Sequence, residues 1–539
     1  MADSRAPEAL TDPQAHTDPL ALTGHDLTID DVVAVARGRT VAIHPDALPR
    51  MERSREVVDR LVSEGRIAYG ITTGFGRFKD KLISADQVAE LQLNLIRSHA
   101  AGTGPELDEE TVRAMLVIRA NTLAMGYSGI RTEVVQLMAD MLNAGVHPCI
   151  PGRGSLGASG DLATLAHMSL VLIGEGEAMY RSRRLDGASA LQDAGLLPVT
   201  LGAKEGLALT NGTTLMAGLG ALLVHRATHL ALTADIAAAM TLEALSGTDR
   251  AYDARVHAIR PHPRQIACAG FLRDILNGSR LLRADNPGNV QDPYTLRCVP
   301  QVHGTVRDTI DYARWVVGIE LNAANDNPLV FASDDPDEAE VISAGNFHGE
   351  PIAVAMDSMK LALADMGNMS ERRAARLVDA DSNEGILPMF LTDHGGLESG
   401  LMLAQYTAAA LASENKVLAH PASADSIPSG ANTEDHVSMG AASVHHTHQV
   451  VENVETIVAI ELIAAAQAID FRCREPEITP EDMGGGTGLA YRLIRRHVPF
   501  LDRDVPLSPL FETVRELVAK GDVVAAVAEK VEIPGPTLD

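Results

Sequence analysis

Residues 437–470 read VSMGAASVHHTHQVVENVETIVAIELIAAAQAID, and their apolar positions recur with a helical period. We expect one helix over this range, well beyond the usual length of about 11–12 residues. The stretches Glu350 to Val378 and Gly400 to about Leu418 have the same pattern, and Glu205 to about Leu245 is nearly continuous helix pattern. Strand signals are few and short. The sequence therefore predicts a mainly α fold built on a central bundle of long helices.

The chain divides into four predicted segments around that bundle. Residues 1–26 are polar and contain proline, so we expect a disordered tail. Residues 27–205 form an N-terminal domain of shorter helices, 206–478 contain the bundle, and 479–539 form a C-terminal helical segment. Within the bundle segment, residues 247–303 are rich in Arg, His, Pro and Asp and are predicted to be irregular.

Composition excludes several classes of function. Of the 539 residues, 45 are Lys or Arg and 72 are Asp or Glu, so the net charge is −27. No basic excess is available to neutralise phosphates, which argues against a nucleic-acid or anionic-membrane partner. The four cysteines are scattered and give neither zinc-site spacing nor a disulfide framework. We find no signal peptide and no uncharged apolar run long enough to span a membrane, so we expect a cytoplasmic protein.

A glycine-rich loop before an apolar helix has an unusual chemical possibility. It reads GSLGASGDL over residues 154–162. Gly160 has no side chain, so its amide nitrogen can approach the carbonyl of Ala158 closely. Attack of that nitrogen on the carbonyl, with loss of water and dehydration of Ser159, would leave an electrophilic methylene on a five-membered ring. Taken alone, an Ala-Ser-Gly sequence is an ordinary loop.

Two tyrosines and an arginine can serve such an electrophile. Tyr69 lies in a loop with three glycines that can close over a substrate, where a phenol can act as base or acid. Tyr294 and Arg297 stand three apart, which puts both on one side of a helical turn. Arginine is the natural bidentate partner of a carboxylate. The alternatives are a tyrosine packed at a loop edge and a surface salt bridge.

Four more polar or aromatic residues are candidates for a binding site. Asn346 can donate to a substrate and Phe347 can form the wall of a pocket, or both only build a turn. His99 ends a predicted helix, and the alternative to a binding role is a structural role at that helix end. Glu414 lies in an otherwise apolar helix, where a buried carboxylate needs a partner such as an imidazole; the alternative is a solvated helix face. No HExxH motif or cysteine partner accompanies the remaining histidines, so we expect no metal.

Together these motifs resemble the aromatic amino acid ammonia-lyase family, and within it the histidine ammonia-lyases. The similarity runs from about residue 27 to past residue 470 and rests on several motifs in the family's order. They are Tyr69–Gly76, Ser98–Gly102, Gly154–Leu162, Asn211–Thr213, Gln291–Arg297, Asn325–Pro328, Asn346–His348 and Ala412–Lys416. The resemblance implies a helical homotetramer whose active sites take residues from three subunits, with no metal and no diffusible cofactor.

The resemblance also implies the chemistry of the loop. Ala158, Ser159 and Gly160 would cyclise to a 4-methylidene-imidazol-5-one (MIO) prosthetic group. Tyr69 would be the base that removes the β-proton of an amino acid substrate.

The same resemblance implies the binding residues. Arg297 would hold the substrate carboxylate, and His99 and Glu414 would face an imidazole ring. The residues that would shape and stabilise the MIO pocket are Asn211, Gln291, Tyr294 and Phe347.

Three positions depart from the family's usual residues. Thr164 stands where proline is usual, Thr433 where glutamine is usual, and Glu398 where asparagine is commoner. Thr164 lies near a helix start, where a hydroxyl can replace proline as a cap. Thr433 lies in a segment that we expect near the pocket, so it bears on the substrate.

The expected reaction is the elimination of ammonia from L-histidine to give trans-urocanate, the first step of histidine breakdown, by a carbon–nitrogen lyase. Ser98, His99 and Glu414 favour histidine, because a buried carboxylate pairs with an imidazole but is left unpaired by a phenyl ring. Three alternatives stay open: a tyrosine or phenylalanine ammonia-lyase, an aromatic 2,3-aminomutase with the same MIO group, and an inactive helical scaffold with a linear tripeptide.

Overall fold

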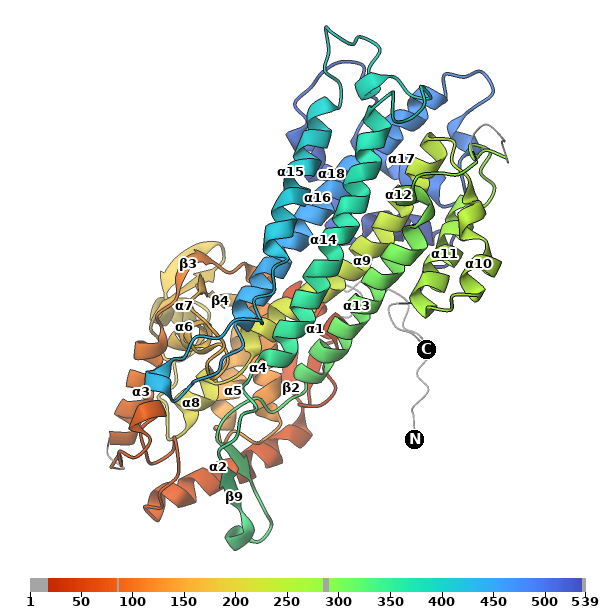
Figure 1. Ribbon diagram of the computed structural model, residues 1–539. Helices are drawn as coiled ribbons and strands as arrows, with labels where there is room; N and C mark the ends of the chain where they lie inside the picture. Colours follow the sequence, from red (N-terminus) through yellow and green to blue (C-terminus); the bar gives the residue numbers. More distant parts are fainter. Residues whose placement is uncertain (1–17, 85–86, 285–289, 536–539) are drawn as a thin grey trace.

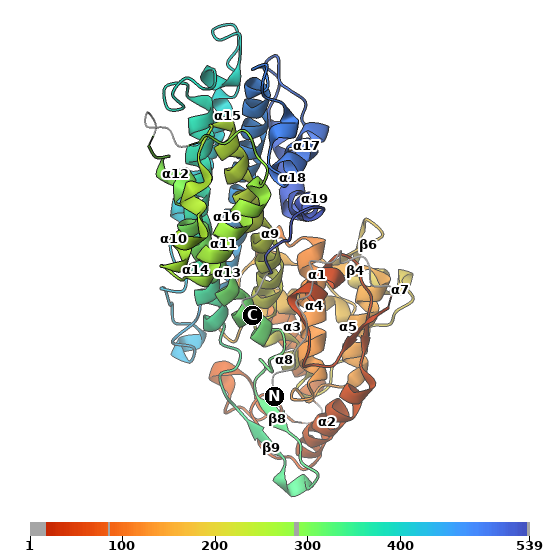
Figure 2. The ribbon, with the colours of Figure 1, turned by 90° about the vertical axis from the view of Figure 1, so that its right-hand side faces the viewer.

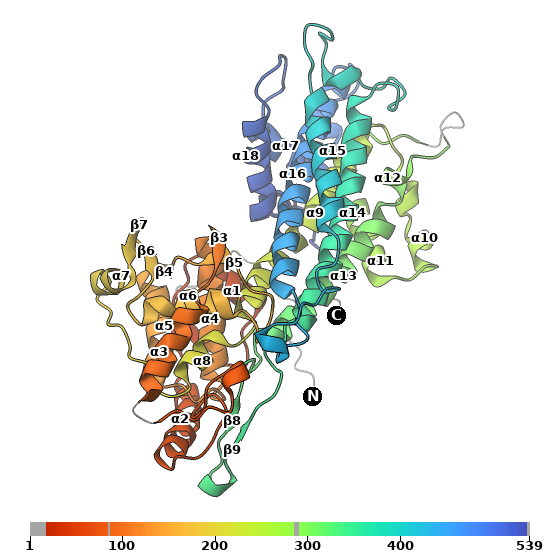
Figure 3. The same cartoon turned by 60° about the vertical axis from the view of Figure 1, so that its left-hand side comes forward.

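A computed structural model describes residues 18–84, 87–284 and 290–535. The molecule is elongated and has two bodies, a bundle of long helices and a broader body of shorter helices and small sheets (Figures 1 and 3). The predicted mainly α fold, with a long central bundle and few short strands, is confirmed.

Five long helices run side by side in the bundle (Figure 1). Nearly every residue of α9 is buried, and most residues of α16 are, so both helices are covered by neighbours on most sides. By length and composition α9 could cross a membrane, but 83% of its most apolar window is buried inside the protein. It is therefore a core helix of the bundle. The five are α9 (Thr214–Ala244), α13 (Val299–Glu320), α14 (Glu350–Val378), α15 (Met402–Leu418) and α16 (Gly440–Arg472).

The structure corrects two predictions within the bundle segment. The helix expected from Glu205 is broken, because α8 (Glu205–Thr210) ends before Asn211, whose backbone is extended. Residues 247–303 are also less irregular than predicted. They contain α10 (Ala254–Ala258), α11 (Pro263–Leu276) and α12 (Tyr294–Arg297), and α11 packs on α13.

The second body contains helices from the first two hundred residues, and one of them, α4, packs against α9 of the bundle. These helices are α1 (Ile29–Ala36), α2 (Leu48–Ser63), α3 (Val88–His99), α4 (Glu109–Ala124), α5 (Thr132–Ala144), α6 (Leu162–Leu172) and α7 (Gly187–Asp193).

Among the described residues, four small sheets complete the fold. Strand β1 lies inside the segment predicted as a disordered tail and pairs in parallel with β2, so that prediction is wrong for residues 20–22; residues 1–17 lie outside the described residues. The pairs are β1 (Leu20–Leu22) with β2 (Val41–Ile43), β3 (Thr103–Glu106) with β5 (Pro151–Arg153), and β8 (Leu329–Phe331) with β9 (Glu340–Ile342). The three-stranded sheet is β4 (Val146–Pro148), β6 (Glu177–Tyr180) and β7 (Arg183–Asp186).

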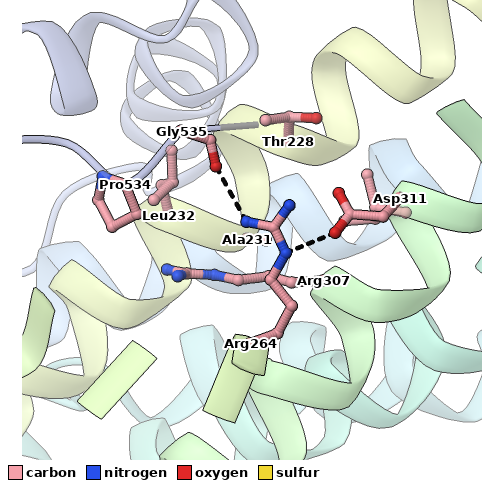
Figure 4. Close-up of a pocket in the computed structure, with 9 residues that line it drawn as sticks. Thr228, Ala231, Leu232, Arg264, Arg307, Asp311, Pro534 and Gly535 are labelled. Carbon is pink, nitrogen blue, oxygen red and sulfur yellow. Dashed lines mark hydrogen bonds and ion pairs between the residues drawn. The ribbon is translucent and has the colours of Figure 1, made fainter. Parts of the chain in front are cut away.

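The C-terminal helices pack against α9 and α16 (Figure 2). They are α17 (Thr487–His497), α18 (Ser508–Lys520) and α19 (Asp522–Ala528). The chain then reaches Gly535, whose carbonyl accepts a hydrogen bond from Arg264 Nη1 at 3.0 Å (Figure 4). The pocket at this contact has a volume of about 20 Å³, which suits a water molecule and is too small for an amino acid. The division of the chain at residues 205 and 478 stays a prediction.

Candidate active site

The Ala158-Ser159-Gly160 loop is a tight turn between β5 and α6. Ser159 has a φ of +52° and Gly160 a φ of +81°. The Gly160 amide donates to the Gly157 carbonyl at 3.3 Å. A Cβ atom on Gly160 would lie 2.1 Å from the Gly212 carbonyl oxygen, so only glycine fits at this position. The turn is therefore compressed at the tripeptide for which cyclisation is expected.

Asp161 anchors this turn to the start of α9. Its buried carboxylate accepts hydrogen bonds from the Met216 amide at 3.0 Å and the Ser155 hydroxyl at 3.1 Å. Burial raises the pKa of Asp161 to about 7, although these donors act in the opposite direction. The Asp161 amide donates to the Gly212 carbonyl at 2.7 Å, and the Gly212 amide donates to the Ser159 carbonyl at 3.2 Å. The break between α8 and α9 thus supplies the backbone groups that clamp the turn.

Asn211, beside this clamp, is buried and only half paired. Its Nδ2 donates to the Asn327 carbonyl at 2.9 Å, whereas its Oδ1 has no partner among the described residues. An unpaired buried acceptor costs about 1–3 kcal/mol, so a further donor is expected there. The unpaired atom and the compressed turn fit a prosthetic group made from Ala158, Ser159 and Gly160.

Glu434 brings a carboxylate to the same turn. The Ser159 hydroxyl donates to Glu434 Oε1 at 3.4 Å, and the Ser429 hydroxyl donates to Oε2 at 2.9 Å. His99 is the last residue of α3, with Nδ1 2.9 Å from the Leu95 carbonyl oxygen. Burial lowers the pKa of His99, while the charge of Glu434 acts to raise it. The imidazole is therefore neutral at pH 7 and lies within electrostatic range of Glu434.

The Tyr69 loop borders this region. The Tyr69 hydroxyl accepts a hydrogen bond from the Gly76 amide at 3.2 Å. The turn that follows, Gly76–Phe78, contacts the turn Gly430–Asn432 that leads to Glu434. Tyr69 also lines a cavity of about 580 Å³ between α2 and the β8–β9 hairpin. The chain thus places Tyr69, Ser159 and Glu434 on neighbouring loops.

The Asn346–His348 loop reaches the same group of loops. Asn346 Nδ2 donates to the Ala324 carbonyl at 3.1 Å, and Phe347 is half-buried. The His348 and His436 rings are stacked, with their centroids 5.3 Å apart. Since His436 follows Glu434 by two residues, this loop lies beside the Glu434 loop.

A second group of predicted residues lies elsewhere in the chain. Tyr294 and Arg297 belong to α12, at the far end of the bundle from α6 (Figures 1 and 3). The Arg297 guanidinium lies 4.4 Å from the centroid of the Tyr294 ring, which is 68% exposed. Gln291 is exposed, and Glu414 in α15 is exposed and accepts a hydrogen bond from Asn453 Nδ2 at 3.5 Å. These residues are not brought into contact with the Ser159 turn, and their roles stay predictions.

Two site residues, Asp161 and Glu434, were not predicted from the sequence. Both stand in stretches that the sequence analysis singled out, but nothing local indicates that Asp161 is buried or that Glu434 meets Ser159.

The three residues that depart from the family's usual pattern lie in different surroundings. Thr164 Oγ1 donates to the Asp161 carbonyl at 3.1 Å instead of capping an amide. Thr433 is exposed in the turn before Glu434. Glu398 accepts from the Asp504 amide at 2.7 Å, which ties two surface loops together.

The described part of the chain contains no candidate metal site. Within residues 18–84, 87–284 and 290–535, no group of three or more His, Cys, Asp or Glu side chains is placed to hold a metal ion.

Known proteins match this chain over nearly its whole length. The sequence profile of the family described as aromatic amino acid lyase matches residues 27–496. A histidine ammonia-lyase from Chloroflexus aurantiacus is 56% identical over 511 residues, 94% of this chain and 97% of that protein. The crystal structure of histidine ammonia-lyase from Trypanosoma cruzi has a TM-score of 0.87 at 41% identity, covering 96% of this chain and 97% of that one. Tyrosine aminomutase from Streptomyces globisporus has a TM-score of 0.90 at 37% identity, covering 96% and 100%.

Proposed function

Since this chain belongs to the aromatic amino acid lyase family, we propose that it eliminates ammonia from L-histidine to give trans-urocanate. It is then a carbon–nitrogen lyase of histidine catabolism. The observation that carries the proposal is the compressed Ala158–Gly160 turn, clamped by Gly212 beside the half-paired Asn211.

We propose that Ala158, Ser159 and Gly160 cyclise to the MIO group. The left-handed backbone at Ser159 and Gly160 and the glycine requirement at position 160 support this step. Once formed, the group supplies an electrophilic methylidene that makes the substrate amine a better leaving group. The remaining chemistry belongs to ordinary side chains of this chain.

Tyr69 and Glu434 have different roles at the substrate. Tyr69 Oη accepts the proton from the β-carbon, and its loop excludes water when it closes. The imidazole of the substrate lies between His99 and Glu434. There the carboxylate accepts a hydrogen bond from the ring N–H, and neutral His99 offers a second polar contact. We assign this carboxylate to Glu434 and not to Glu414, because Glu434 lies at the turn that carries Ser159.

The missing half of the pocket comes, in this proposal, from neighbouring copies in a homotetramer. Arg297 clamps the substrate carboxylate, while Tyr294 and Gln291 line the pocket. The exposure of the large aromatic side chains Tyr294, Trp315 and Tyr406 supports contact of these helices with another copy. The substrate is the only small molecule required, with no metal and no diffusible cofactor, and we place the protein in the cytoplasm.

The test is ultraviolet absorbance after mixing the purified protein with L-histidine. Absorbance should rise, because the imidazole-acrylate product is conjugated and the substrate is not. A rise with tyrosine or phenylalanine but not with histidine would overturn the substrate assignment. A β-amino acid with little alkene would instead indicate an aminomutase, the activity named for one structural relative.

A further inference from the structure

Two loops that carry proposed site residues meet through a pair of histidines. One loop holds Asn346 and Phe347, and the other holds Glu434. His348 follows Phe347 directly, and His436 follows Glu434 by two residues. The His348 Nε2 and His436 Nδ1 atoms lie 3.2 Å apart, and the rings are inclined by 22°. The pair therefore joins the loop that walls the pocket to the loop that carries its carboxylate.

The backbone fixes the direction of this hydrogen bond. The amide of Glu350 donates to His348 Nδ1 at 3.3 Å, so that nitrogen is an acceptor. In a neutral imidazole the other nitrogen then carries the proton. His348 Nε2 is thus the donor and His436 Nδ1 the acceptor. The bond has one defined polarity and needs an acceptor at residue 436.

Each loop is also tied to another part of the chain. The first loop is tied to the segment before it, since Asn327 Oδ1 accepts from the Ala344 amide at 2.7 Å. The second is tied to the Ser159 turn, since the Met439 amide donates to the Leu156 carbonyl at 3.0 Å. The histidine pair closes the gap between them, together with the close packing of Gly349 on Ser438.

We propose that His436, through its hydrogen bond with His348, is a positioning residue that sets Phe347 and Glu434 in register around the substrate. The inference rests on the proposed function for its catalytic readout. His436 is exposed and His348 half-buried, so their bond contributes little to stability and acts on geometry. A small misplacement of a substrate-contacting group is enough to slow the chemistry strongly.

The experiment compares His436→Leu, which removes the acceptor, with His436→Asn, whose side-chain oxygen can replace it. We expect His436→Leu to lower kcat by about tenfold or more with a smaller change in KM. Its melting temperature and intact mass should match those of the unmodified chain. His436→Asn should recover most of kcat. His394→Leu, at an exposed histidine in a distant loop, is the matched control and should change neither parameter.

A double variant separates a specific pair from a general disturbance. His348→Leu combined with His436→Leu should be no slower than the slower single variant, because both remove the same bond. The proposal is overturned if His436→Leu keeps the kcat of the unmodified protein. It is also overturned if His436→Asn loses as much kcat as His436→Leu, or if the losses of kcat add in the double variant. Failure of the unmodified protein to act on histidine would instead overturn the proposed function, and the two results are distinguishable.

Discussion

Ser159 and Glu434 are 275 residues apart in the chain, yet the Ser159 hydroxyl donates to Glu434 Oε1 at 3.4 Å. Ser429 holds the other carboxylate oxygen at 2.9 Å. Gly430 allows this approach, because a Cβ atom there would lie 2.9 Å from that oxygen. A local loop therefore aims one oxygen of Glu434 at the turn that supplies the electrophile.

Replacement of Glu434 by glutamine tests this arrangement. We expect Glu434→Gln to lower kcat/KM with histidine by about 10- to 100-fold, since a hydrogen bond to a charged group contributes about 1.5–3 kcal/mol. Glu414→Gln is the matched control, since Glu414 is exposed in α15 and bonded to Asn453. Urocanate absorbance measures both. If Glu414→Gln instead has the larger effect, the carboxylate that binds the substrate imidazole is Glu414, which would reach the site from another copy.

Replacement of Gly212 by alanine tests the clamp on the turn. A Cβ atom at Gly212 would lie 2.5 Å from Asn325 Oδ1 and 2.6 Å from Arg119 Nη1, and the backbone has a φ of +144°. We expect Gly212→Ala to destabilise the protein by about 1–3 kcal/mol. Intact mass should also show more chains that have not lost two water molecules.

Gly318 provides the control for that substitution. It lies inside α13, and a Cβ atom added there would have no heavy atom within 4 Å, so Gly318→Ala should stabilise the helix by about 0.5–1 kcal/mol. If both substitutions have the same effect on melting temperature and mass, the clamp has no special role.

Mixed oligomers test whether sites are shared between copies. Tyr69→Phe and Arg297→Ala should each be nearly inactive alone. Co-expression should restore activity, since random mixing leaves about a quarter of the shared sites with both residues intact. Tyr69→Phe co-expressed with Ser159→Ala should stay inactive, because those residues lie on neighbouring loops of one chain. If co-expression of Tyr69→Phe with Arg297→Ala restores no activity, the site does not combine Tyr69 of one chain with Arg297 of another.

Glu243 predicts a pH dependence of stability. Burial in α9 raises its pKa from 4.5 to about 7, although its carboxylate accepts from the Gly484 amide at 2.7 Å. Between these two values the folded state keeps a proton that the unfolded state has lost. The free energy of unfolding therefore falls as the pH rises from about 4.5 to 7, and this contribution is constant above 7.

Chemical denaturation at pH 5 and pH 8 measures the effect. The unmodified protein should lose up to about 3 kcal/mol more than Glu243→Gln over this interval. Glu516→Gln, at an exposed carboxylate paired with Lys520, should behave like the unmodified protein. An equal pH response in all three proteins would show that Glu243 is not protonated in the folded state.

Local signals explain how far the sequence could predict the fold. The bounds of α14 agree with the expected Glu350 to Val378, because helical periodicity and terminal residues lie within the helix itself. The break at Asn211–Thr213 was missed, because its cause is the Ser159 turn that bonds to Gly212. The strand β1 was missed for the same kind of reason, since three residues become a strand only when β2 lies beside them.

The sequence by itself determined the long helices, the acidic charge balance, and the Ala-Ser-Gly loop for which cyclisation is proposed. Each of these depends on composition or on residues that are neighbours in the chain. Only the tertiary structure decided that Asp161 is buried, that Glu434 meets Ser159, and that Arg297 lies at the other end of the molecule. Those facts depend on segments that approach through packing of the core, and periodicity along the chain does not contain that information.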